Sequence, residues 1–290
     1  MRRIAPGWLS DPATRAVTEA LAPARPLFVG GCVRDALLGI EAEDVDLCVA
    51  SPPEQTIRLL EAAGLKAVPT GVEHGTVTAV SGGRGFEVTT LRRDVETFGR
   101  HARVAFTGDV AADAARRDFT MNALYADAAG ALVDPLGGLP DLEAGRVRFI
   151  GDPNARIEED YLRVLRFFRF TARFSRAGVD AEGEAACAAH AGGLARLARE
   201  RIGHEMKRLL AAPDPSEATA AMARAGVLAA VSRGADPAAL PRLVEAERAA
   251  CARPSWPRRA GAIGAWAADW RLSKAETKRL AALRAALASE

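Results

Sequence analysis

The chain has 290 residues, too many for one small core, and this length predicts about two domains. Its net charge of +2 excludes nucleic-acid binding through overall charge, so any nucleic acid must be held by a local basic patch. The four cysteines stand far apart without a C-x-x-C pair, which argues against zinc and against a disulfide framework. Because no apolar run reaches signal-peptide or membrane-spanning length, we expect a cytosolic protein without a membrane segment.

The first elements predict a strand that turns sharply into a helix. Residues 1–26 predict a helix, and the apolar residues 27–29 predict a short strand that stops at Gly30 and Gly31. The free N–H groups and positive dipole end of a helix that starts there favour a phosphate, and Arg34 can add a charge-assisted contact. The alternative is that the two glycines are only a turn.

Two carboxylates follow this turn. Asp44 and Asp46 alternate with Val45 and Leu47 in a second predicted strand that begins near Asp44. The carboxylates then lie on one side, while Val45 and Leu47 point into the core. Two like charges so close repel unless a cation lies between them, and hard divalent cations bind carboxylate oxygen. The pattern indicates a two-ion site for phosphoryl displacement; the alternative is that Asp44 is a cap and Asp46 faces solvent.

A helix and a hairpin come next. Residues 53–64 predict the helix, and β-branched runs at 76–80 and 86–91 flank a glycine-rich turn and predict the hairpin. The first half of the chain is therefore a mixed sheet with helices packed on it. Glu87 becomes a third metal ligand if its strand lies beside the strand of the two aspartates; acidic residues on exposed strand faces are equally common.

Residues 92–116 are polar and aperiodic, which is typical of a functional lid or loop. Either this segment faces an anionic partner or it is a solvated loop. Its basic residues are Arg92, Arg93, Arg100, His101 and Arg103.

Arg116 and Arg117 open a predicted helix over residues 116–124. Two cations at a helix start oppose its dipole, so they need an anion such as a triphosphate. Asp118 and Asn122 are four residues apart and share a face of that helix. An acceptor and an amide on one face suit the two hydroxyls of a ribose.

Beyond Gly151 the periodicity becomes helical. We predict three domains: a head with the catalytic site at 1–150, a neck at 151–212 and a short body or tail at 213–290. Basic residues on the later helices form either an RNA-binding surface or a solvated face.

A predicted helix over 158–170 places Asp160 and Arg163 one turn apart, with Arg166 three residues further on. Such a pair is often a surface salt bridge. Alternatively, its carboxylate and guanidinium offer an acceptor beside a donor, which matches the amino group and ring nitrogen of adenine and of cytosine. Uracil and guanine reverse that order. A wall with this pair selects ATP and CTP, because the wrong base leaves buried polar groups unpaired.

Five motifs in one order resemble the class II tRNA nucleotidyltransferases, a family that includes CCA-adding enzymes and bacterial poly(A) polymerases. The motifs are GGCVRD at 30–35 with D-x-D at 44–46, RRDFTMNA at 116–123, DPLGGLPDL at 134–142, EEDYLRVLR at 158–166, and RERIGHEMKRLL, which ends at Leu210. The resemblance implies an α+β fold: a polymerase-β-like nucleotidyltransferase head with a mixed sheet and helices, followed by an all-α neck and body.

The resemblance also implies a reaction and the residues that carry it. Two Mg²⁺ ions are expected on Asp44 and Asp46, the nucleotide on Arg116 and Arg117, and the base on Asp160 with Arg163. The implied reaction adds C, C and A from CTP and ATP to the 3′ end of tRNA and releases pyrophosphate. The alternatives are a poly(A) polymerase and a non-catalytic RNA-binding relative. Because residues 92–115 are present, we favour full CCA addition over CC addition. No protein partner is implied.

Overall fold

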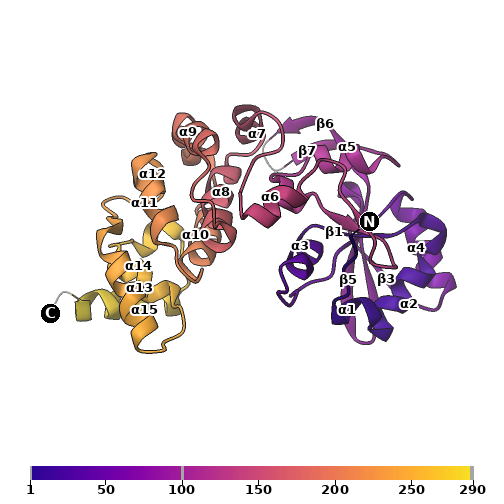
Figure 1. Ribbon diagram of the computed structural model, residues 1–290, viewed down its shortest axis with the longest axis horizontal. Helices are drawn as coiled ribbons and strands as arrows, with labels where there is room; N and C mark the ends of the chain where they lie inside the picture. The colour runs from indigo at the N-terminus through magenta and orange to yellow at the C-terminus, as the bar shows by residue number, and fades with distance from the viewer. Residues whose placement is uncertain (1, 99–100, 288–290) are drawn as a thin grey trace. The chain divides into compact units, whose positions relative to one another are not determined.

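The computed structural model describes residues 2–98 and 101–287 (Figure 1). The chain forms two compact units, Met1–Glu143 and Ala144–Glu290. The first unit, called the head below, is a sheet with helices, and the second, called the helical unit, contains helices. The predicted α+β class, with a mixed-sheet head followed by a helical region, is confirmed. Within the described ranges, no helix combines the length and apolar character that crossing a membrane requires.

A seven-stranded sheet forms the centre of the head, in the order β3-β4-β5-β2-β1-β8-β9. Only the β2–β5 pair is parallel in this sheet, so it is mixed as predicted. The predicted hairpin is present as β4 and β5. The strands are β1 (Leu27–Val29), β2 (Leu47–Val49), β3 (Lys66–Gly71), β4 (Thr76–Ser81), β5 (Arg84–Thr90), β8 (Tyr125–Ala126) and β9 (Leu132–Val133).

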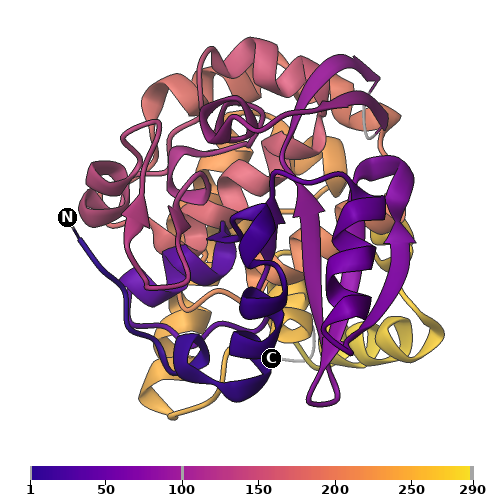
Figure 2. The same ribbon diagram turned by 90° about the vertical axis from the view of Figure 1, so that its right-hand side faces the viewer.

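Short helices surround this sheet. Asp11 caps the N-terminus of α2 by accepting hydrogen bonds from the backbone of Ala13 and Thr14. Helices α2 and α4 pack against β4, and α4 also packs against β3 (Figure 2). The head helices are α1 (Gly7–Ser10), α2 (Pro12–Ala20), α3 (Gly31–Leu37), α4 (Pro53–Ala62) and α5 (Val110–Ala115), with 3₁₀ turns η1 (Ala22–Ala24), η2 (Val72–His74) and η3 (Thr120–Asn122). Helix α6 (Leu139–Ala144) ends the unit.

Four secondary-structure predictions in the head are wrong. The helix expected over residues 1–26 is divided into α1, α2 and η1. The segment expected to be aperiodic forms a two-stranded ribbon of β6 (Arg92–Phe98) and β7 (His101–Phe106) (Figure 2). The strand expected from Asp44 begins at Leu47. No helix spans 116–124; helix α5 ends before it, and Arg116 is its C-cap. The arginines therefore follow a helix C-terminus, where the dipole favours cations.

The helical unit packs around α8 and α10. The predicted helix over 158–170 is broken at Asp160, which ends α7 before α8 begins. Its buried pair Arg169–Glu205, 2.6 Å apart, joins the two central helices. The helices are α7 (Pro153–Glu159), α8 (Leu162–Phe174), α9 (Ala181–Ala189), α10 (Arg199–Leu210), α11 (Ser216–Arg224), α12 (Val227–Val231), α13 (Leu240–Ala249), α14 (Trp256–Ala262) and α15 (Lys274–Leu287), with η4 (Ala191–Arg196), η5 (Pro237–Ala239) and η6 (Ala267–Trp270).

Candidate functional site

A pocket of about 200 Å³ opens in the head at the ends of β1, β2 and β5. It contains two carboxylates and three guanidinium groups, which is a dense set of charges for so small a volume. Its lining residues are Val29, Gly30, Gly31, Asp46, Leu47, Thr76, Glu87, Thr89, Arg92, Arg116 and Arg117.

The sheet register brings Asp46 and Glu87 together. Strands β2 and β5 are parallel with Leu47 opposite Val88, so the residue before each one lies at the same level of the sheet. Burial, followed by the negative charges of Glu87 and Asp44, raises the pKa of Asp46 to about 6, against the lowering effect of Arg117. Strand β5, which carries Glu87, therefore lies beside the strand that follows the two aspartates, which is the condition that the prediction for Glu87 set.

Asp44, Val45 and Asp46 precede strand β2, which starts at Leu47. Val45 and Asp46 line different pockets. That Asp44 and Asp46 lie on one side stays a prediction. The prediction that Val45 points into the core is wrong, because it is half-buried, whereas Leu47 is 1% exposed. Asp44 is exposed and does not line the 200 Å³ pocket.

Among the described residues, no group of three or more acidic, histidine or cysteine side chains is arranged to hold a metal ion. The chemistry of the donors nevertheless suits a hard cation. Asp44, Asp46 and Glu87 interact through their charges, and they offer carboxylate oxygens, which Mg²⁺ prefers.

The glycine turn forms part of the pocket wall. Gly30 has a φ of +71°, which strains any residue with a side chain. A Cβ atom at this position comes within 3.3 Å of the Arg117 guanidinium. Glycine therefore lets the arginine lie directly on the turn, beside the backbone of Gly31.

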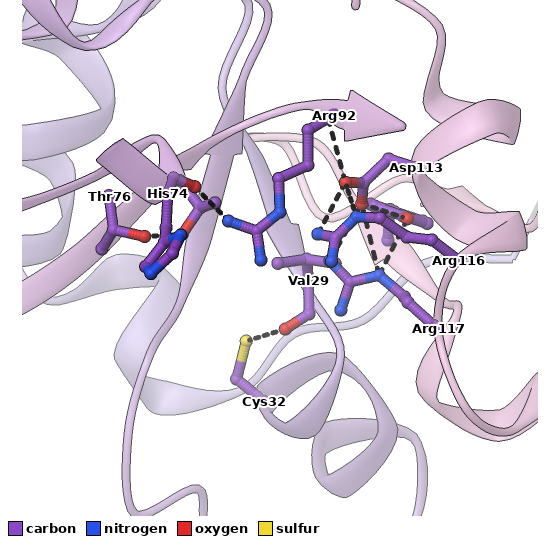
Figure 3. A network of polar contacts seen from close by, with 10 residues as sticks. Val29, Cys32, His74, Thr76, Arg92, Asp113, Arg116 and Arg117 are labelled. Atoms are coloured by element: carbon purple, nitrogen blue, oxygen red, sulfur yellow. Dashed lines mark hydrogen bonds and ion pairs between the residues drawn. The ribbon is translucent and has the colours of Figure 1, made fainter. Parts of the chain in front are cut away.

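A buried carboxylate that was not predicted to be functional holds the arginine pair. The side chain of Asp113 is 1% exposed and accepts from Arg116 Nε at 2.8 Å and from Arg117 Nη2 at 3.0 Å. It also accepts from the Tyr125 hydroxyl at 2.9 Å, and Arg117 Nε donates to the same hydroxyl at 3.1 Å. Figure 3 shows Asp113 between the two guanidinium groups. Its spacing of three and four residues from the arginines was the available sequence signal.

Arg92 completes the basic wall. Its guanidinium donates to the backbone carbonyl of His74, and its backbone N–H donates to Asp113 at 3.3 Å (Figure 3). The sequence placed Arg92 in a basic cluster but not in the nucleotide pocket. The pocket therefore receives cations from both the start of the ribbon and the end of α5.

Three other predicted nucleotide ligands bond to one another beside the pocket. Arg34 donates to Asn122 Oδ1 at 2.6 Å and pairs with Asp35 at 2.8 Å. Asn122 Nδ2 donates to Asp118 at 3.0 Å. Arg34, Asp118 and Asn122 are all buried, and none lines the 200 Å³ pocket. The shared helix face expected for Asp118 and Asn122 is also absent, because η3 replaces that helix.

In the helical unit, Asp160 and Arg163 have separate partners. Asp160 accepts from Arg201 at 2.8 Å and from the backbone of Leu162 at 3.1 Å. Arg163 pairs with Glu159 and donates to the carbonyl of Arg156 at 2.7 Å. Each group of the predicted pair is therefore oriented by a contact of its own, Asp160 by Arg201 and Arg163 by Glu159.

Arg166 lies on the same side of α8. Its guanidinium stacks over the ring of Phe170, 5.3 Å from the ring centroid, and the side chain is half-buried. This contact orients Arg166 along the helix.

Two parts of the chain match family models. Residues 27–148 match the model described as "Poly A polymerase head domain". Residues 179–238 match the model described as "Probable RNA and SrmB- binding site of polymerase A". The first match includes every residue of the 200 Å³ pocket.

The chain is also similar to individual proteins over longer stretches than the family models cover. The Bacillus stearothermophilus CCA-adding enzyme, solved in complex with CTP, is 30% identical with a TM-score of 0.80, covering 97% of this chain and 71% of that one. The human mitochondrial CCA tRNA nucleotidyltransferase 1 is 42% identical over 205 residues, or 67% of this chain and 47% of that protein. The CCA-adding enzyme of Lacticaseibacillus paracasei is 39% identical over 189 residues, or 64% of this chain and 46% of that protein. The chain spans about half the length of the curated relatives it matches.

Proposed function

The chain belongs to the family of class II CCA-adding enzymes and poly(A) polymerase heads, and on this premise we propose that it is a template-independent nucleotidyltransferase. It adds C, C and A to the 3′ end of tRNA from CTP and ATP. The 3′ oxygen of the RNA forms a bond to the α-phosphorus, the bond from that phosphorus to the β-phosphate bridging oxygen breaks, and pyrophosphate leaves. The observation that supports this most strongly is the pocket that combines Asp46 and Glu87 with three arginines.

The arginines of the pocket bind the triphosphate. Arg92, Arg116 and Arg117 provide charge-assisted hydrogen bonds to phosphate oxygens, and they stabilise the negative charge that develops on the departing pyrophosphate. The glycines at 30 and 31 leave room for phosphate to approach the backbone. Three buried residues next to the pocket stabilise the glycine turn through hydrogen bonds to one another: Arg34, Asp118 and Asn122.

Asp44 and Asp46 hold Mg²⁺, with Glu87 as a third carboxylate. When bound, Mg²⁺ supplies Lewis-acid stabilisation of the phosphate charge and favours the ionised form of the attacking hydroxyl. The raised pKa of Asp46 supports this proposal, because the charges of Glu87 and Asp44 both act against the ionised form of Asp46, and a bound cation would offset that repulsion.

Asp160 and Arg163 read the incoming base. A carboxylate accepts from the exocyclic amino group of cytosine or adenine, and a guanidinium donates to the adjacent ring nitrogen. Arg201 and Glu159 orient this pair, so it does not have to be ordered when the nucleotide binds. Arg166 supports the same wall. We place these roles in a neck at 151–212 that follows a catalytic head at 1–150.

We propose that the later helices bind the RNA. The match of residues 179–238 to an RNA-binding model favours a body or tail at 213–290 that contacts the RNA backbone. We propose a cytosolic protein that acts on tRNA without a protein partner.

A product gel tests this function. A tRNA transcript that lacks CCA is incubated with Mg²⁺ and with CTP, ATP or both. We expect two nucleotides from CTP alone, three from the mixture and none from ATP alone. An Asp44→Ala variant, whose exposed side chain makes it tolerable to the fold, should add none.

Poly(A) polymerase activity is the second candidate, because the head matches a model described for that enzyme. It predicts a ladder from ATP alone on any RNA 3′ end. A gel without extension under all conditions supports a non-catalytic RNA-binding protein instead.

A further inference from the structure

We infer that Asp113 is a positioning residue for the triphosphate: it holds Arg116, Arg117 and the backbone of Arg92 in the geometry that the pocket requires. This inference rests on the triphosphate-binding role proposed above. Asp113 does not line the pocket, so it acts on phosphate through the arginines.

The geometry of the carboxylate supports this role. Oδ1 accepts from Arg116 Nε at 2.8 Å and from Arg92 N at 3.3 Å, while Oδ2 accepts from Arg117 Nη2 at 3.0 Å. Oδ2 also accepts from the Tyr125 hydroxyl at 2.9 Å. Arg117 Nε donates to Oδ2 as well, at 3.3 Å. The donors to this carboxylate come from three separate places: β6, the end of α5 and β8.

The charges explain why a carboxylate is needed here. Two adjacent guanidinium groups repel, and the side chains of Arg116 and Arg117 are only 17% and 20% exposed. Burial alone raises the pKa of Asp113, but the charges of Arg117 and Arg116 outweigh it and lower the pKa below the ordinary value. Asp113 is therefore ionised at neutral pH. Asp113 supplies one negative charge beside Arg92, Arg116 and Arg117, so the side of the pocket formed by these three arginines keeps an excess of positive charge for a phosphate.

The contacts also connect two segments of the chain. The backbone bond from Arg92 fixes the first residue of the β6–β7 ribbon, and the guanidinium bonds fix the residues that follow α5. Without Asp113, the three arginines no longer share an anchor. They then have to be ordered by the ligand itself, which weakens binding.

The test measures triphosphate binding directly. Inorganic pyrophosphate and a non-hydrolysable CTP analogue are titrated into the full chain by calorimetry, with wild type, Asp113→Asn and Tyr125→Phe. We expect Asp113→Asn to lower the affinity for both ligands at least about tenfold, because the variant loses charged hydrogen bonds to the arginines. Tyr125→Phe keeps the carboxylate and should weaken them less. In turnover, the KM for CTP and for ATP should rise by the same factor, while the KM for the RNA changes little.

A matched control separates positioning from folding. Asp141 is a buried head carboxylate that accepts from the Thr120 hydroxyl at 2.7 Å and does not line the pocket. Asp141→Asn should lower the melting temperature but leave pyrophosphate affinity unchanged. Should Asp113→Asn prove too unstable, Tyr125→Phe alone still tests the network.

The inference is overturned if folded Asp113→Asn binds pyrophosphate like wild type, or if it weakens RNA and pyrophosphate equally. Failure of the proposed function looks different. If the wild type binds pyrophosphate more tightly than Asp113→Asn but extends no RNA, the polymerase activity is refuted while the positioning role of Asp113 stands.

Discussion

Replacing Asp46 with asparagine should make the metal-free protein more stable while it removes catalysis. The Asp46 carboxylate is partly buried and lies beside the charges of Glu87 and Asp44. Burial and these two charges together raise its pKa from 3.8 to about 6. At pH 8 the folded protein must keep this group ionised in an environment that disfavours the charge. Asparagine has nearly the same shape without the charge, so Asp46→Asn relieves that cost.

The size of the effect follows from the pKa shift. A shift of about two units corresponds to roughly 3 kcal/mol, and solvent screening of the half-buried side chain reduces this to about 1–2 kcal/mol. The sign follows from linkage. Because the folded pKa lies above the unfolded one, the wild type is more stable in acid and loses stability as the pH rises through about 6. The advantage of the variant should therefore be full at pH 8 and vanish near pH 4.

Urea unfolding in EDTA at pH 5 and pH 8 measures this difference. A substitution of the exposed Glu61, Glu61→Gln, serves as the control and should change stability little at either pH. Added Mg²⁺ should stabilise the wild type more than Asp46→Asn at pH 8. A variant that is less stable than the wild type at pH 8 in EDTA, or a difference that does not depend on pH, refutes the reasoning.

Three further predictions concern other parts of the molecule. Arg163→Ala should let UTP compete with CTP in single-nucleotide incorporation, and unchanged discrimination would contradict base reading by this residue. Gly30→Ala should cost about 1 kcal/mol in thermal unfolding and weaken CTP binding, because its φ is +71° and Arg117 lies in the way; normal affinity would rule out the contact. Arg259→Ala takes one of its two arginine partners from the buried Glu247 carboxylate, leaves Arg258 as the other, and removes a donor from the carbonyl of Leu210; it should lower urea stability by about 3 kcal/mol, and a loss under about 1 kcal/mol would contradict this.

Local patterns were enough where the sequence encodes a local element. The β-branched runs predicted the β4–β5 hairpin. The same reasoning failed at 116–124, where apolar residues at helical spacing lie on either side of the 3₁₀ turn η3 instead. Phe119 and Leu124 are both fully buried there, so tertiary packing decided the backbone.

The partners of the predicted site residues lay beyond sequence reasoning for a different reason. Arg201 bonds to Asp160 from 41 residues away, and no local spacing connects them. The ribbon of β6 and β7 was missed because residues 92–106 lack an alternating apolar pattern, and strand pairing there depends on backbone hydrogen bonds. Asp113, in contrast, has a local signal in its spacing from Arg116 and Arg117, but that spacing has meaning only on a helix, and residues 92–116 were predicted to be aperiodic.

The arginines and the carboxylates of the head pocket, taken together, restrict the choice of ligand more than either set of charges does alone. The arginines attract an anion, while Asp46 and Glu87, with Asp44 nearby, repel each other and attract a cation. An anion alone leaves the carboxylates crowded, and a divalent cation alone leaves the arginines without a counterion. A metal–triphosphate complex would satisfy both groups at once, because the carboxylates would hold Mg²⁺ and the arginines would pair with the phosphate oxygens. Mg²⁺ and CTP together should therefore raise the melting temperature by more than the sum of their separate effects. Simple additivity would mean that the two charged groups of the pocket do not act on one ligand.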